Sequence, residues 1–238
     1  MHAVSSASVP KPLYCDPIFD GAADVSIAYD RGAKLWNMFY TNRRATFKLP
    51  EPKDGAWVHG ADIGIATSSD GVAWRYQSTA KLPKECTSVT SWAPELYYEK
   101  GVYDMWLTVV PCIFSRWGPP GSEARMVHVT SRDLSSSRCD TEVDVGINGM
   151  IDASVIKLGS GYRMRYKDET AQSHIMAADP NWSQHTVIQV AELVYKDGWL
   201  TVDRNVDLSF ELAAPTDRLS RLCRAVQPDH GSEHVVAV

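Results

Sequence analysis

The clearest pattern of hydrophobic and polar positions lies in the segment 149–169, which reads GMIDASVIKLGSGYRMRYKDE. Two short alternating runs, IDASVIKL and YRMRYK, flank the tripeptide Gly159-Ser160-Gly161. Alternation over four to eight residues with a glycine-rich break predicts a β-hairpin. Asp152 stands at the start of the first strand, where that strand would enter its sheet.

The same layout recurs at three other places, as an acidic residue, an apolar strand, a turn that contains glycine, and an aromatic second strand. The acidic residues there are Asp24, Glu95 and Glu192. Successive acidic residues stand about 70, 60 and 40 positions apart, and a four-stranded propeller blade takes roughly 40–50 residues. The repeat therefore predicts an all-β fold, a β-propeller, with these carboxylates converging on the central axis at one end.

Convergent carboxylates have a chemical use. Two or three carboxylates that face a common cavity are what acid/base cleavage of a glycosidic bond requires. The hairpin repeat alone fits a binding propeller equally well. The repeated acidic residue favours catalysis.

Length and composition are those of a globular protein. The chain has 238 residues, of which 44% are hydrophobic and 22% charged, so one sizeable core is within reach. The net charge of −5 gives no basic surface for nucleic acid or an anionic membrane, and we expect neither as a partner. Eight Trp and ten Tyr suit strands and also offer stacking platforms for sugar rings.

The five cysteines are scattered and form no CxxC motif. An odd, dispersed set predicts reduced thiols rather than a disulfide framework. The N-terminal sequence has no apolar core of a secretory signal, so we expect a cytoplasmic protein, although a chain trimmed of its signal would look the same. Clustered His and Cys ligands for a catalytic metal are also missing from the sequence.

We expect a single domain over residues 1–238, with two unusual ends. Residues 1–20 are rich in Pro and Ser and are predicted to wrap around the body before the first blade. In residues 204–238 the alternation stops, and a short amphipathic helix is predicted around 217–226. The turn at Ser69-Asp70-Gly71, followed by Trp74, is predicted to be structural, because Asp bonds its own backbone and Gly accepts a positive φ.

Taken together, the segments DVSI at 24–27, WAPE at 92–95 and IDAS at 151–154, followed by Glu192 before an apolar strand, resemble glycoside hydrolase family 43 and its relatives. Longer phrases such as FDGAADVSI, FYTNRRA, WVHGADIGIATSSDG and RYKDE extend the resemblance over roughly residues 13–203. The resemblance implies a five-bladed β-propeller that hydrolyses arabinosides or xylosides with inversion of configuration. It also implies a small glycoside or oligosaccharide as substrate.

The resemblance assigns roles to three carboxylates. Asp24 falls where the family has its general base, Asp152 where it has the aspartate that orients the acid and tunes its pKa, and Glu192 where it has the general acid. An inverting pair should stand roughly 6.5–9.5 Å apart to admit the attacking water. The sequence departs from the family after Glu192, where Leu193 and Val194 replace the usual Gly-Pro.

Six further residues are candidates for binding the substrate. Arg43, Arg44 and His59 lie in a long polar loop, which a solvated surface excursion explains equally well. The other three are Trp92, which would stack on a sugar face, Glu95, and Lys167 at the end of the central hairpin. No cofactor is expected to be required, while a structural calcium or another cation in the central channel is allowed, with His234 beside it.

A five-bladed enzyme of this kind needs about 300 residues by blade length, so the last blade is predicted to be incomplete or altered. An open propeller exposes sheet edges, which a homo-oligomer would cover. Two alternatives remain. One is a non-catalytic carbohydrate-binding propeller. The other is a retaining family-32-like fructosidase with a nucleophile about 5–5.5 Å from the acid, for which the sequence offers Cys15-Asp16-Pro17 but no Trp-Met-Asn-Asp-Pro start.

Overall fold

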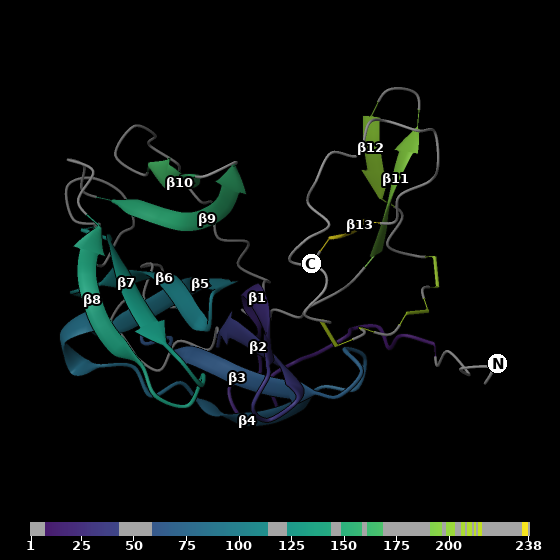
Figure 1. The fold of residues 1–238 in the computed structure, drawn as a ribbon, viewed down its shortest axis with the longest axis horizontal. Coiled ribbons are helices and arrows are strands. Elements are labelled where there is room, and N and C mark those ends of the chain that lie inside the picture. The colour runs from purple at the N-terminus through teal and green to yellow at the C-terminus, as the bar shows by residue number, and fades with distance from the viewer. Residues whose placement is uncertain are drawn as a thin grey trace, which may run out of the picture.

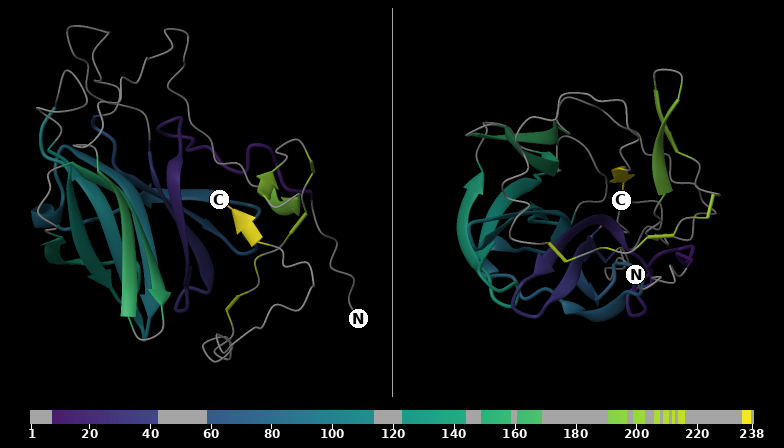
Figure 2. Two further views of the ribbon diagram at one scale, coloured as in Figure 1. Left: turned by 90° about the horizontal axis from the view of Figure 1, so that it is seen from above. Right: turned by 45° about the vertical axis from the view of Figure 1, so that its right-hand side comes forward.

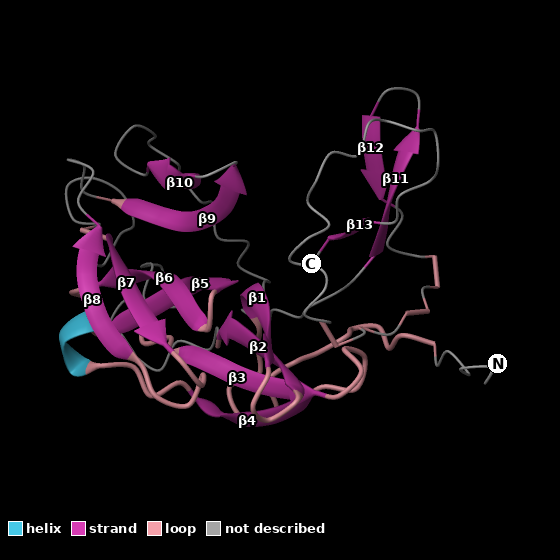
Figure 3. Ribbon diagram, viewed as in Figure 1, coloured by secondary structure: helices cyan, strands magenta, loops and turns pink. Residues whose placement is uncertain are grey.

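The computed structural model describes residues 8–42, 59–113, 123–143, 149–158, 161–168, 191–196, 199–202, 206–207, 209–210, 212, 214–215 and 235–237. Within these residues the protein consists of strands and one short 3-10 helix, η2 (Lys84–Cys86) (Figure 3). No helix in this part of the chain is long and apolar enough to cross a bilayer.

The first two sheets are four-stranded antiparallel meanders in which spatial order follows sequence order (Figure 1). The first contains β1 (Ala23–Asp30), β2 (Leu35–Thr41), β3 (Ile63–Ser68) and β4 (Arg75–Thr79). The second contains β5 (Thr90–Glu99), β6 (Val102–Val110), β7 (Arg125–Ser131) and β8 (Arg138–Val143). Four consecutive strands in a simple meander are the structure of a propeller blade.

The third sheet is the hairpin predicted from the central repeat. It pairs β9 (Met150–Leu158) with β10 (Gly161–Asp168). Met150 and Ala153 of β9 pack with Met126 of β7, and Trp106 and Met164 lie against this cluster. The two outer strands expected for this blade lie outside the described residues.

The fourth sheet has three strands, β12 (Trp199–Val202), β11 (Ala191–Lys196) and β13 (Val235–Ala237), in that order. Figures 1 and 2 draw it apart from β1–β10. The predicted all-β propeller fold is confirmed, and the sheets formed by the described residues do not close into a ring. The expected incompleteness of the last blade stays a prediction, because much of residues 169–234 lies outside the described residues.

The first two blades are held together by apolar side chains from their facing surfaces. Phe39 and Ile63 of the first blade pack with Met105, Leu107 and Val127 of the second. Each of these side chains is at most 7% exposed. This packing fixes the relative position of β1 and β5, the strands that begin at the candidate site.

The prediction of reduced thiols is wrong for two of the cysteines. Cys86 in η2 and Cys139 in β8 form a disulfide with a Cα–Cα distance of 5.6 Å, although 53 positions separate them in sequence. Sequence spacing did not indicate the pair, because only the fold places η2 against β8. Disulfides persist mainly in oxidising compartments, so one of the two grounds for a cytoplasmic location is lost.

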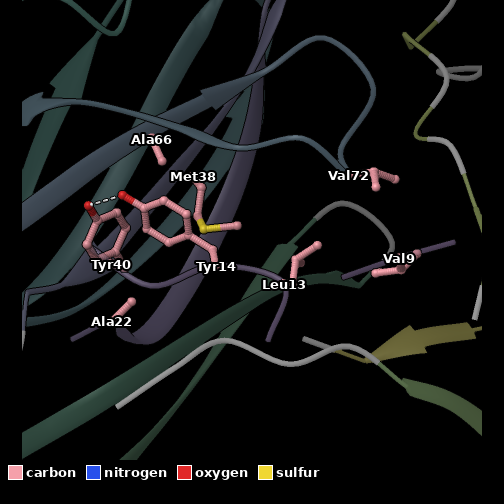
Figure 4. Close-up of a cluster of buried hydrophobic side chains, with 8 residues drawn as sticks. All are labelled: Val9, Leu13, Tyr14, Ala22, Met38, Tyr40, Ala66 and Val72. Atoms are coloured by element: carbon pink, nitrogen blue, oxygen red, sulfur yellow. Dashed lines mark hydrogen bonds between the residues drawn. The ribbon is translucent and has the colours of Figure 1, made fainter. Parts of the chain in front are cut away.

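Residues 8–20 pack against the first blade, where Val9, Leu13 and Tyr14 join a buried cluster with Met38 and Tyr40 (Figure 4). The Tyr14 and Tyr40 hydroxyls lie 2.9 Å apart, and Tyr40 donates to Asp16 Oδ2 at 2.7 Å. Since the single hydroxyl proton of Tyr40 goes to Asp16, Tyr14 donates to Tyr40. Burial raises the pKa of Tyr14 to about 12. Asp16 is fully buried within this network, which anchors the N-terminal segment.

The chain returns to the first blade between β12 and β13. Leu212 N donates to Asp70 O at 2.8 Å, and Trp36 Nε1 donates to Leu212 O at 3.0 Å. Phe210 lies against the same buried cluster as Tyr14. Residues near Leu212 therefore cover the β3–β4 turn.

That turn has the structural role expected for it. Asp70 Oδ1 accepts hydrogen bonds from Val72 N and Ala73 N, both at 2.8 Å, and Trp74 Nε1 donates to Gly71 O at 2.7 Å. Gly71 has a φ of 77°. These backbone hydrogen bonds lower the pKa of Asp70.

Candidate active site

Each of the first three blades carries the same irregularity near the start of its first strand. One extra residue is inserted between two ladder pairs, which makes a β-bulge. The flanking pairs are Ala23↔Thr41 and Ser26↔Phe39 in the first blade, Trp92↔Thr108 and Glu95↔Trp106 in the second, and Ile151↔Lys167 and Ser154↔Arg165 in the third. The three blades can therefore be aligned residue by residue at this end.

The first bulged residue is left-handed in all three blades. The φ angles are 52° at Asp24, 46° at Ala93 and 54° at Asp152. This conformation costs roughly 1–2 kcal/mol for most residues other than glycine, and Asp tolerates it better than most. Asp24 and Asp152 thus occupy one structural position, in the first and third blades.

The acidic residue of the second blade is out of register with the other two. Glu95 falls two residues after Ala93, at the position that Ser26 and Ser154 occupy in the other blades. The prediction that Glu95 repeats the position of Asp24 is therefore wrong. Alternation could not indicate this shift, because counting back from an apolar strand does not register a bulged residue.

The environment of Asp24 ties it to the second blade. Asp24 is exposed, and its Oδ2 accepts a hydrogen bond of 3.1 Å from Thr41 Oγ1. Thr41 is fully buried, and its Oγ1 also accepts from Ala93 N at 2.9 Å. The hydroxyl therefore connects the carboxylate of one blade with the bulge of the next.

Asp152 is connected in a similar way. Its side chain is exposed, and its backbone N donates to Thr108 Oγ1 at 3.3 Å. Thr108 is fully buried and pairs with Trp92, the residue before the bulge of the second blade. The two aspartates thus lie at the same end of the first and third blades, and the second blade, through the start of β5, connects them.

Glu95 contributes to the joint between the second and third blades. Val155 N donates to Glu95 Oε1 at 2.9 Å, and Leu96 N donates to Ser26 Oγ at 2.9 Å in the preceding joint. Burial raises the pKa of Glu95, while its hydrogen bonds with Val155 and Ser154 act in the opposite direction. Its predicted role in substrate binding stays a prediction.

His59 and Trp92 come together at the start of β5. Their rings stack with centroids 6.5 Å apart and an interplanar angle of 30°. His59 is 1% exposed, whereas Trp92 is partly exposed and packs against Val110 and Ile151. Gly60 N donates to Thr90 Oγ1 at 2.9 Å, which holds the segment before β3 against β5. Trp92 therefore lies beside the bulge and offers a partly apolar surface there.

Lys167 also falls at this end of the molecule. It pairs with Ile151 and so occupies the position that Thr41 and Thr108 have in the first two blades. Its side chain is exposed. The fold thus brings Lys167 to the predicted end of the third blade.

Asn42 and Asp62 also lie at this end, and the sequence pattern did not single them out. Asn42 N donates to Asp62 O at 2.9 Å, and Asp62 N donates to Asn42 Oδ1 at 2.6 Å. Desolvation raises the pKa of Asp62, although the residue keeps access to solvent. The sequence signal that could have identified Asp62 is its place directly before the apolar run IGIA.

Three predicted residues cannot be joined to this arrangement. Arg43 and Arg44 lie outside the described residues. The backbone of Glu192 lies in β11 opposite Val236 of β13, and its side chain is outside the description. Its role as general acid therefore stays a prediction.

A cleft of about 370 Å³ lies between the first two blades at the opposite end of their strands. Two of its polar side chains, those of Asp30 and Tyr103, serve local structure. Asp30 Oδ1 accepts from Gly32 N and Ala33 N, and Tyr103 Oη donates to Tyr29 O. We therefore place the candidate site at the bulged end and not in this cleft.

Within the described residues, no group of three or more His, Cys, Asp or Glu side chains is arranged to hold a metal ion. The cation allowed in the channel stays a prediction, because His234 lies outside the described residues. What the described site offers is an anchored, exposed carboxylate at Asp24, an equivalent one at Asp152, and an aromatic surface at Trp92. These groups can take a proton from water and hold a sugar ring.

The protein is an all-β propeller by its own sheet order, and its similarity to known proteins is distant. No family model matches the chain, and neither does any curated protein. Among solved structures it is similar to a family 43 β-xylosidase/α-arabinofuranosidase from a compost microbial metagenome in complex with xylotriose, with a TM-score of 0.48, 16% identity, and coverage of 67% of this chain and 45% of that one.

Two other solved structures are similar to comparable extents. A Cellvibrio cellulosa α-L-arabinanase complexed with arabinohexaose gives a TM-score of 0.42 and 18% identity, with 60% of this chain and 44% of that one covered. An exo-β-1,3-galactanase from Phanerochaete chrysosporium gives a TM-score of 0.42 and 16% identity, with 61% and 32% covered. The aligned region spans less than half the length of each of these three chains.

Proposed function

We propose that this protein is a glycoside hydrolase that cleaves a small arabinofuranoside or xyloside by single displacement with inversion. The observation that carries the proposal is the equivalence of Asp24 and Asp152, which are the left-handed first residues of matching bulges at the start of β1 and β9. Two exposed carboxylates in one structural position, at the same end of the first and third blades, are an arrangement suited to acid/base chemistry.

In the proposed reaction Asp24 is the general base. It takes a proton from a water molecule, whose oxygen attacks the anomeric carbon from the face opposite the leaving group. Glu192 gives its proton to the leaving glycosidic oxygen, so the C–O bond breaks as the new one forms. Asp152 orients Glu192, and its negative charge favours the protonated form of the acid before the reaction.

The sugar ring would lie over Trp92, whose partly exposed indole stands beside the bulge of the second blade. Aromatic faces bind the apolar side of a sugar ring. His59 supports the indole from behind, since it is buried and stacked on it. Arg43, Arg44, Glu95 and Lys167 are the further residues proposed to bind substrate hydroxyls, and no cofactor is required.

A second candidate is a non-catalytic carbohydrate-binding propeller. The observation that favours it is the position of β11, which Figures 1 and 2 draw apart from the blades that carry Asp24 and Asp152. Without an acid the same aromatic surface would bind a sugar and leave it intact. The two candidates differ in turnover and agree on binding.

The experiment compares two leaving groups. The wild type, Asp24→Asn and Glu192→Gln are assayed on the p-nitrophenyl and the methyl glycosides of α-L-arabinofuranose and β-D-xylose. Nitrophenolate leaves with little help from an acid, whereas methoxide is a poor leaving group and must be protonated as it departs. We expect Asp24→Asn to lose about 10²–10⁴-fold on both leaving groups, and Glu192→Gln to lose that factor on methyl glycosides and far less on nitrophenyl glycosides.

A folded wild type that binds xylo- or arabino-oligosaccharides by calorimetry but hydrolyses none of them would replace the enzyme with the binding propeller. Equal losses of Glu192→Gln on the two leaving groups would contradict the role of Glu192 as acid. Circular dichroism of each variant serves as the control for folding.

A further inference from the structure

We propose that Thr41 is a positioning residue for the Asp24 carboxylate and couples its orientation to the joint between the first two blades. The inference rests on the proposed function, because it concerns the proposed base of that reaction. Thr41 itself does not touch the reacting atoms. It acts through the side chain of Asp24.

The first argument is that both hydrogen-bonding directions of the Thr41 hydroxyl are in use. Its single proton is donated to Asp24 Oδ2 at 3.1 Å, and an oxygen lone pair accepts from Ala93 N at 2.9 Å. A hydroxyl has one proton to give, so the hydrogen bond from Ala93 N directs that proton toward the carboxylate. The side chain of Thr41 is fully buried, so water does not compete for its hydroxyl.

The second argument is that the backbone of Thr41 is held on both sides. Thr41 pairs with Ala23 of β1 and with Ile63 of β3, in two antiparallel ladders. The branched side chain of Thr has few allowed χ1 rotamers, so a fixed backbone fixes the hydroxyl as well. Asp24, by contrast, is an exposed residue in a bulge, and its backbone position is less regular than that of Thr41.

The second blade provides a natural comparison. Thr108 occupies the position of Thr41, is equally buried, and accepts a hydrogen bond of 3.3 Å from Asp152 N of the next blade. The bulge residue of its own blade is Ala93, which has no carboxylate. The repeated threonine therefore serves the joint between blades in both places, and the contact with a carboxylate is an addition specific to the first blade.

The consequence is that Asp24 has one preferred orientation relative to β5, on which the proposed sugar-binding Trp92 lies. A base that is held in place loses less freedom when the transition state forms. This effect disappears when the hydroxyl is removed, even if the strand is unchanged.

The test uses Thr41→Val, which removes the hydroxyl, and Thr41→Ser, which keeps it. We expect Thr41→Val to lower kcat about tenfold with little change in KM. Thr41→Ser should recover most of kcat. A Thr41→Ser variant as impaired as Thr41→Val, or a Thr41→Val variant with an unchanged kcat, would overturn the inference.

A second readout does not depend on activity. The urea midpoints of wild type, Thr41→Val, Asp24→Gly and the double variant form a cycle, and Thr108→Val replaces Thr41→Val in a matched control cycle. We expect Thr41→Val to lower the midpoint less in the Asp24→Gly background, and Thr108→Val to lower it equally in both. Additive effects of Thr41→Val and Asp24→Gly would overturn the contact, whereas an inactive wild type with intact coupling would contradict the proposed function instead.

Discussion

The left-handed backbone of Asp24 and Asp152 has consequences for any experiment that mutates these residues. Their φ angles of 52° and 54° strain most side chains, and Asn and Asp adopt such angles most readily after glycine. Catalytic loss in an alanine variant would therefore be mixed with loss of stability. The choice of replacement decides whether the two can be separated.

We predict that Asp24→Asn keeps wild-type stability within about 0.5 kcal/mol, whereas Asp24→Ala loses about 1 kcal/mol more, because Ala lacks the local hydrogen bonding that makes a positive φ tolerable. Urea denaturation of the two variants measures the difference. Equal stability of Asp24→Asn and Asp24→Ala would mean that the bulge is not strained at this residue.

At the scale of single elements, the hairpins follow from the sequence and the bulges do not. Lys100 and Gly101 have φ angles of 51° and 84°, as a two-residue turn between β5 and β6 requires, and the sequence locates that turn. The bulges at Asp24, Ala93 and Asp152 each add one residue without disturbing the apolar positions beyond them. The displacement of Glu95 from the acidic repeat was therefore invisible to alternation.

Contacts that join distant elements were also beyond the sequence. Asp24 and Thr41 are 17 positions apart, and Thr41 and Ala93 are 52 apart, so nothing local indicates their hydrogen bonds. The same holds for Cys86 and Cys139. The residues that chemistry singles out, Asp24, Asp152 and Trp92, were predictable because carboxylates and an indole stand out at strand starts. The residues that position them were not.

The β3–β4 turn gives a prediction at this scale. A Cβ added at Gly71 would lie 2.4 Å from Leu212 Cγ, and the φ of 77° is strained for any other residue. Gly101 has a similar φ of 84°, yet nothing lies within 4 Å of a Cβ there. We expect Gly101→Ala to cost about 1 kcal/mol through backbone strain alone, and Gly71→Ala to cost about 1–3 kcal/mol beyond that through overpacking.

Chemical denaturation of the two glycine variants measures these costs, and Gly71→Ala combined with Leu212→Ala is the control. We expect Gly71→Ala to lower the free energy of unfolding less in the Leu212→Ala background than in the wild-type background. Equal costs of Gly71→Ala and Gly101→Ala would mean that the segment around Leu212 does not cover the turn in solution.

At the scale of the whole molecule, hydrogen bonds join the first three blades at the end that carries the candidate site. One set of these bonds repeats between neighbouring blades, and its pairs are Thr41 with Ala93, Thr108 with Asp152, Ser26 with Leu96, and Glu95 with Val155. The first blade is in turn covered by residues 8–20 and by the segment around Leu212. The arrangement holds the backbone of Asp24 and Asp152 rigidly, and a displacement reaction needs side chains that are held in place.

The central claim is that Asp24 is the general base of an inverting glycosidase, and chemical rescue tests it most directly. Asp24→Gly removes the carboxylate, fits the positive φ and leaves room for a small nucleophile. With a p-nitrophenyl glycoside as substrate, we predict a loss of about 10²–10⁴-fold that azide restores. The product, followed by proton NMR, should be a glycosyl azide of inverted anomeric configuration, and the wild type should release its sugar with inversion as well. A glycosyl azide of retained configuration, wild-type hydrolysis with retention, or an Asp24→Gly variant as active as the wild type would contradict the account.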